Sequence, residues 1–205
     1  MTAVAVEATA AEDQNPRVSM VYRLAPEGEG SVDFGSIRFD GGWIANVRAF
    51  AGERELSFRT TSGSESRLDG VVELPAEIDG PFELRLDYEV HGTAQDQPLI
   101  LPFLVAGWPP HESSPQAFHA EVQLPANRFV RDSFPTEFER GVSVDRTADL
   151  QVLRFELPVV PAMIRLELSD RAPLVGVGRG LDLAALALLT VVALLGWRRL
   201  RETWT

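Results

Sequence analysis

The sequence contains no cysteine, which excludes disulfides, thiolate metal sites, cysteine nucleophiles and iron–sulfur clusters. It also contains no lysine, so all 19 basic residues are arginines, and they are outnumbered by 30 acidic residues to give a formal charge of −11. The arginines before Gly180 are spread singly along the chain rather than gathered into a basic patch. We therefore do not expect nucleic acid as a partner.

Residues that commonly carry catalysis are also scarce. Only three histidines are present, and no serine lies in a Gly-x-Ser-x-Gly elbow. His119 shares the solvent-facing side of its expected strand with Glu121, and a facing His91 could complete a metal site, but the spacing does not fix one. We interpret the histidines as solvated surface residues. The sequence thus predicts no catalytic residues, no metal and no cofactor, and a protein that is not an enzyme.

Long apolar runs are rare as well, and one of them lies near the C-terminus. Residues 183–197 read LAALALLTVVALLGW without a charge. With Leu181 and Asp182 they give a helix of about 25 Å, slightly shorter than a hydrocarbon core of about 30 Å. A run that is apolar on every face would otherwise have to be surrounded by protein. The pattern predicts a single transmembrane helix over residues 181–197.

Aromatic and basic residues follow this span, as is typical of a membrane interface. They are Trp197, Arg198, Arg199, Arg201 and Trp204. The arginine excess after the span favours a cytoplasmic C-terminus, with the larger N-terminal part on the periplasmic side of the inner membrane. Gly180, Ala184 and Ala187 are small residues that would let another membrane helix approach closely.

The N-terminal residues do not read as an export signal, because MTAVAVEATAAEDQ has no basic n-region and no continuous apolar h-region. Either the span itself directs export or the natural start lies elsewhere, and Ala8 to Ala11 resembles a signal-peptidase site. The remaining alternative is a tail-anchored protein that faces the cytoplasm.

The region before the span predicts a β-rich domain. In residues 82–90 and 118–124 apolar and polar residues alternate strictly, as they do in half-buried strands. Further strands are expected at 18–24, 32–39, 43–50, 56–60, 68–74, 99–106, 141–144, 150–157 and 164–168. Turn residues such as Asp40-Gly41-Gly42 separate several of them. Many short strands at steady spacing predict an all-β fold, a β-sandwich that is immunoglobulin-like or related.

The expected organisation therefore has five parts. Residues 1–16 form a flexible N-terminal arm, 17–171 the β-sandwich, 172–180 a juxtamembrane linker, 181–197 the transmembrane helix and 198–205 a short basic tail. Prolines at positions 98, 102, 158 and 161 indicate edge strands or bulges, since proline lacks the amide donor that a central strand needs.

Three segments, LRLDYEVHG, LPFLVAGWPP and FHAEVQLP, precede the span. In this order they resemble the extracytoplasmic domains of bacterial predicted membrane proteins of unknown function. The resemblance covers about a third of the chain. It implies a β-sandwich and transfers no catalytic residue.

The apolar run 99–107 ends in Trp108, Pro109 and Pro110, which is either a core strand with a rigid loop or an exposed docking element. We expect an accessory or scaffold subunit of a larger membrane complex, for instance a respiratory or photosynthetic assembly. Its partners would be other membrane subunits and the bilayer. The alternative is a stand-alone envelope receptor for a small ligand or glycan, which a cleft lined by Trp43 and Trp108 would favour.

Overall fold

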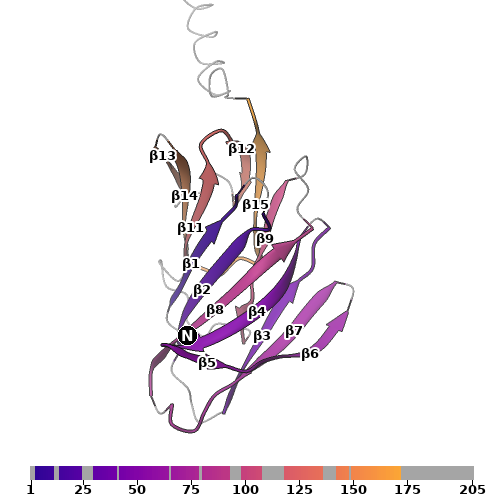
Figure 1. Ribbon diagram of the computed structural model, residues 1–205, viewed down its shortest axis with the longest axis vertical. Helices are drawn as coiled ribbons and strands as arrows, with labels where there is room; N and C mark the ends of the chain where they lie inside the picture. Colours follow the sequence, from indigo (N-terminus) through magenta and orange to yellow (C-terminus); the bar gives the residue numbers. More distant parts are fainter. Residues whose placement is uncertain are drawn as a thin grey trace, which may run out of the picture. The chain divides into compact units, whose positions relative to one another are not determined.

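Every regular element in the described part of the chain is a β-strand (Figure 1). The computed structural model describes residues 3–11, 14–24, 30–40, 42–64, 66–78, 80–92, 98–107, 118–135, 142–147 and 149–171. Within these residues the strands form three sheets of eight, four and three strands. The prediction of an all-β fold with packed sheets is confirmed.

The largest sheet has the strand order β13-β14-β11-β1-β2-β8-β4-β5. Its strands, in that order, are Val142–Arg146, Leu150–Leu157, Phe118–Pro125, Ala3–Thr9, Arg17–Leu24, Phe82–His91, Trp43–Ala51 and Arg54–Leu56. All neighbours are antiparallel except β1 and β11, which run parallel. Side chains on one face of this sheet are buried and those on the other face water, which explains the strict alternation in β8 and β11.

Strand β1 occupies residues that the sequence assigned to a flexible arm. Ala3–Thr9 lies between β2 and β11 and joins the two halves of the large sheet. Val4, Val6 and Ala8 are buried in the core, so this segment is held by apolar burial on one face and by a strand on each edge. A signal-peptidase site at Ala8 to Ala11 does not fit this arrangement, because cleavage there would remove a central strand.

The two smaller sheets have the orders β10-β3-β7-β6 and β12-β15-β9. The strands of the first are Val105–Ala106, Ser31–Ile37, Arg67–Glu73 and Phe58–Ser64, and those of the second are Phe129–Phe134, Met163–Ser169 and Leu99–Pro102. The expected strand 99–106 is therefore two strands, because the chain leaves one sheet at Pro102 and enters another at Val105. Pro102 lies in β9, an edge strand, which is where proline is tolerated.

The crossing segment Phe103–Leu104 is buried against the inner face of the large sheet. The hydroxyl of Tyr88 donates a hydrogen bond to the carbonyl of Pro102 at 2.9 Å, and the hydroxyl of Tyr22 donates to the carbonyl of Leu104. The ring of Phe103 packs on Phe118, with 5.4 Å between ring centroids. The three sheets thus share one core, and buried tyrosine hydroxyls satisfy the carbonyls on both sides of the crossing.

The chain divides into two units, residues 1–171 and 172–205. The expected linker, transmembrane helix and basic tail all belong to the second unit and lie outside the described residues. In the described ranges, no helix has the length and apolar character needed to cross a membrane.

Candidate functional site

The site residues predicted from the sequence lie outside the described part of the chain. They are Trp108, Pro109, Pro110, Gly180, Ala184, Ala187, Trp197, Arg198, Arg199, Arg201 and Trp204. Their roles in docking, helix packing and membrane contact stay predictions. The described residues contain a different candidate, a groove of about 960 Å³ beside β3.

The groove lies where β3 loses its neighbour. Strand β10 pairs with β3 only at Gly35 and Phe34, because the chain crosses to the other sheet at Leu104. The amide of Arg38 donates to Ser66 on the β7 side, whereas the carbonyl of Asp33 accepts from Gly107 on the opposite side. Since successive residues of a strand point their backbone groups to alternate edges, the N–H and C=O of Ile37 face the open edge. In the described ranges, no strand pairs with Ile37 on that side.

The walls of the groove are largely apolar. Phe34, Phe103, Val105 and Val160 contribute to them. Ile37 also lines the groove and is 48% exposed, which is unusual for a large aliphatic side chain at the end of a strand. Such a surface is suited to receive an apolar side chain from outside.

The lining also contains a few polar groups. Asp33 lines the groove, and within the described ranges no salt bridge to it is found. Asp69 is paired with Arg67 at 2.5 Å. The hydroxyl of Ser36 is buried and has no hydrogen-bond partner among the described residues. The groove therefore combines an apolar pocket, one uncompensated carboxylate and an unused hydroxyl, which is the composition of a recognition site.

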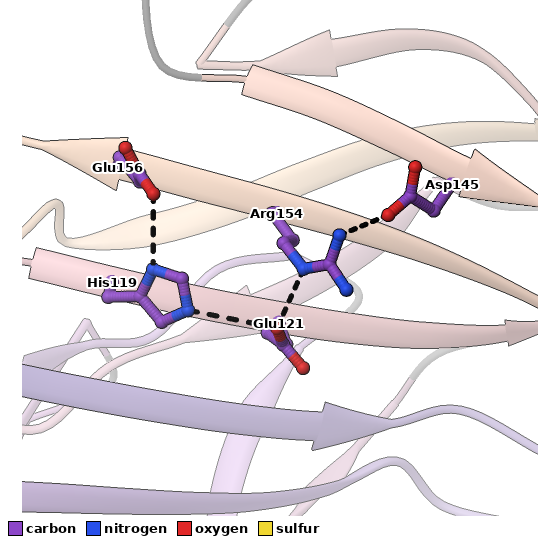
Figure 2. Close-up of polar contacts among 5 residues, drawn as sticks. All are labelled: His119, Glu121, Asp145, Arg154 and Glu156. Carbon is purple, nitrogen blue, oxygen red and sulfur yellow. Dashed lines mark hydrogen bonds and ion pairs between the residues drawn. The ribbon is translucent and has the colours of Figure 1, made fainter.

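The outer face of the large sheet is entirely different, since it carries ion pairs. Figure 2 shows one group, in which Nε of Arg154 donates to Glu121 at 2.8 Å and the same guanidinium contacts Asp145. His119 lies 3.8 Å from both Glu121 and Glu156. The hydrogen bonds that Arg154 donates to Glu121, and then to Asp145, raise the pKa of Arg154 above its ordinary value. These pairs are exposed to water and each contributes little to stability.

A metal site that joins His119 to His91 is not formed. Across the sheet His119 is level with Ala5, Val21 and then Arg85. His91 lies three strands away and six residues farther along β8, which places the two imidazoles more than about 20 Å apart. Among the described residues, no group of three or more metal-ligating side chains is close enough to hold an ion.

The sequence missed the groove because its residues carry no motif. The alternation in β3 does place Asp33, Gly35 and Ile37 on one face. What it does not show is that β10 begins only at Val105 and leaves Ile37 without a neighbour. That depends on where the chain crosses between sheets, which no local pattern encodes.

Comparisons with known proteins give only distant structural matches. No family model matches the chain, and no curated protein matches it. The M1 zinc metallopeptidase from Deinococcus radiodurans is 16% identical with a TM-score of 0.44, over 82% of this chain and 42% of that one. Its E323A mutant bound to a Tyr-Ser-Ala substrate is 15% identical with a TM-score of 0.45 over the same shares. Native yeast LTA4 hydrolase is 13% identical with a TM-score of 0.44, over 83% of this chain and 29% of that one.

The chain thus spans less than half the length of the structures it matches. These neighbours are peptidases and a hydrolase, and they contradict the prediction that the chain is not an enzyme. That prediction is corrected and is not kept. No residue role is transferred from the neighbours to this chain.

Proposed function

We propose that the protein is a single-pass, membrane-anchored subunit that docks a partner subunit through its β-domain. The anchor is the apolar run 181–197 with its flanking Trp and Arg residues. The arginine excess after the span favours a periplasmic β-domain and a cytoplasmic tail in the inner membrane. The host is a larger membrane complex, for instance a respiratory or photosynthetic assembly.

One observation carries the proposal: the groove beside β3 combines an open strand edge with an exposed apolar side chain. An extended partner segment can hydrogen-bond to the backbone of Ile37 and place an apolar side chain against Ile37 and Val105, which line the groove and are not fully buried. The carboxylate of Asp33 then favours a basic residue in that segment. The chain's charge of −11 supports the same choice, because it attracts a cationic partner.

Ile37→Asp tests the docking function directly. It puts a charge at the mouth of the groove and should weaken association by about tenfold or more, since burying one aliphatic side chain contributes about 1.5–3 kcal/mol. The full chain is extracted from its native membrane in mild detergent, separated by size and analysed by mass spectrometry. We expect co-migration with membrane subunits at fixed stoichiometry, which Ile37→Asp abolishes.

Leu150→Asp is the matched control, because Leu150 is exposed to a similar extent (44%) on β14, away from the groove. It should leave the complex intact. Asp33→Arg should also weaken the complex, through charge repulsion with a basic partner segment. If the wild-type chain migrates alone, or if Ile37→Asp leaves its partners bound, the docking proposal fails.

The alternative of a ligand- or glycan-binding module was expected to use a cleft lined by Trp43 and Trp108. Trp43 does not line the groove beside β3. It lies on the outer face of the large sheet, near a second and more polar groove of about 440 Å³.

A further inference from the structure

Trp43 is a large aromatic residue on the water-facing side of the large sheet. It is 44% exposed, at the start of β4, directly opposite His91 on β8. The two rings are in contact, with centroids 6.3 Å apart and planes inclined by 39°. The remaining side chains on this face are mainly charged pairs, so an exposed indole among them is unusual and suggests a binding role.

The backbone beside Trp43 leaves room for its ring at Gly92. Gly92 has a φ of +88°, and a Cβ placed on it would lie 2.2 Å from the indole. Only glycine therefore permits both this backbone conformation and this approach of the ring. The indole therefore packs closely against the backbone at Gly92, just after β8, and the rest of the ring is exposed to solvent.

A second backbone feature lies beside the first. Strand β4 bulges between Ala45 and Arg48, and Asn46 within the bulge has a φ of +55°. A left-handed residue inside a strand is costly and typically marks a place where a side chain has been re-aimed. Here the bulge directs the amide of Asn46 to Glu89, with Nδ2 and Oε2 3.0 Å apart.

Glu89 connects these features into one polar row. Its Oε2 lies 3.3 Å from Nε2 of His91, and the same ring nitrogen lies 3.2 Å from Nδ2 of Asn15. Hydrogen bonds from Asn46, and then from His91, lower the pKa of Glu89 below its ordinary value. Glu89 is thus an ionised acceptor at neutral pH, held in place between Trp43 and the polar groove that Asn46 and Glu89 line.

The charges in this groove are nearly balanced. Arg17 lies 4.0 Å from Glu89, Arg48 is bound to Glu55 at 2.8 Å, and Ser19 donates to Asp87 at 2.7 Å. No strong positive or negative field remains to select an ion. A neutral ligand with many hydroxyl groups fits better, because a hydroxyl can accept from the Arg17 guanidinium, donate to the Glu89 carboxylate and do either with the Asn46 amide.

We propose that Trp43, Asn46 and Glu89 form a binding site for a neutral saccharide on the outer face of the large sheet. The C–H face of a pyranose ring stacks on the exposed indole. Its hydroxyls, or those of the next sugar unit, bond to Asn46, Glu89 and Arg17 along the groove. This site shares no residue with the groove beside β3 and does not depend on the docking function.

The probes for the test are maltoheptaose and N-acetylglucosamine hexamer, titrated into the full chain in mild detergent. Binding is followed by isothermal titration and by the NMR signals of the indole N–H groups. We expect saturable binding of at least one probe with a dissociation constant near or below about 1 mM. Trp43→Ala should weaken this binding by about tenfold or more, whereas Trp43→Phe should retain part of it.

Two further variants separate a binding role from a structural one. Asn46→Gly keeps the left-handed backbone but removes the amide, and it should weaken binding while the variant remains folded. Phe134→Ala removes another exposed aromatic side chain (52% exposed), on β12 of the three-stranded sheet, and should leave binding unchanged. The proposal is overturned if neither probe binds at about 10 mM, or if folded Trp43→Ala binds as well as the wild-type chain.

Discussion

The chain has only two tyrosines, and the hydroxyls of both donate to backbone carbonyls at the crossing between the small sheets. Tyr22 and Tyr88 are buried on the inner face of the large sheet, where their hydroxyls donate to the carbonyls of Leu104 and Pro102. These carbonyls flank the point where the chain crosses between the two small sheets. Replacing either tyrosine by phenylalanine keeps the ring and removes only the donor.

Each replacement leaves a buried carbonyl without its hydrogen bond. A buried polar group that loses its partner costs about 1–3 kcal/mol, so we expect about 2 kcal/mol for Tyr22→Phe and for Tyr88→Phe. In a domain of this size this corresponds to a fall of roughly 4–8 °C in the unfolding temperature. The two losses should not add fully, because both carbonyls belong to one short crossing segment.

The assay is thermal and urea unfolding of the full chain in mild detergent, followed by near-ultraviolet circular dichroism. Thr147→Val is the control, since the Thr147 hydroxyl donates to the Leu150 carbonyl at 3.0 Å on the surface, where water can replace it. That change should cost less than about 0.5 kcal/mol. If both tyrosine variants are as stable as Thr147→Val, the hydroxyls do not hold the crossing and the reasoning is wrong.

Three other predictions concern titration and strand β1. Burial raises the pKa of both tyrosines above the ordinary 10.0, so their stabilising contribution is complete below pH 10 and is lost as the pH rises further. Tyrosinate absorbance should therefore appear only together with unfolding. A reversible titration of tyrosine near pH 10 in the folded protein would contradict this. Val6→Asp places an unpaired charge in the core and should lower the free energy of unfolding by more than about 3 kcal/mol, measured by thermal unfolding. Glu7→Ala, on the outer face of β1, should lower it by less than about 0.5 kcal/mol. Equal effects of the two substitutions would mean that β1 is not a core strand. Asn46→Gly should raise the pKa of Glu89 toward its ordinary 4.5, as measured by NMR of the carboxyl carbon. In the wild-type chain the stabilisation that comes from the lowered Glu89 pKa is present above pH 4.5 and is lost as the pH falls through the lowered pKa. An unchanged Glu89 pKa in the variant would show that Asn46 is not the main cause of the lowered value.

Alternation of apolar and polar residues predicted much of the fold. Strands β8 and β11 begin at the residues expected, Phe82 and Phe118, because one face of the large sheet is buried and the other is wet along their whole length. Strand β12 was not predicted, since FVRDSF has polar residues at too many positions to show a clear period. The pattern succeeds where a strand is regular and half-buried.

Strand β1 shows a second limit. Val4, Val6 and Ala8 do alternate with outward residues, but alanine has a low strand propensity and the segment lies at the start of the chain. Its parallel partner at Phe118 is more than a hundred residues away, so no local turn signals the pairing. Only the tertiary structure supplies the neighbour that makes this segment a strand.

Both candidate sites lie where the regular pattern stops. The groove beside β3 exists because β10 is two residues long, and the polar row next to Trp43 exists because β4 bulges at Asn46. A period of two describes an uninterrupted ladder, and it places side chains correctly only as long as every residue has a partner across the sheet. At a missing neighbour or an extra residue the ladder frees backbone groups or turns a side chain, and these are the changes that let a strand bind something other than its own sheet. The alternation that revealed the strands of this protein could therefore not reveal its sites, because each site is an exception to it.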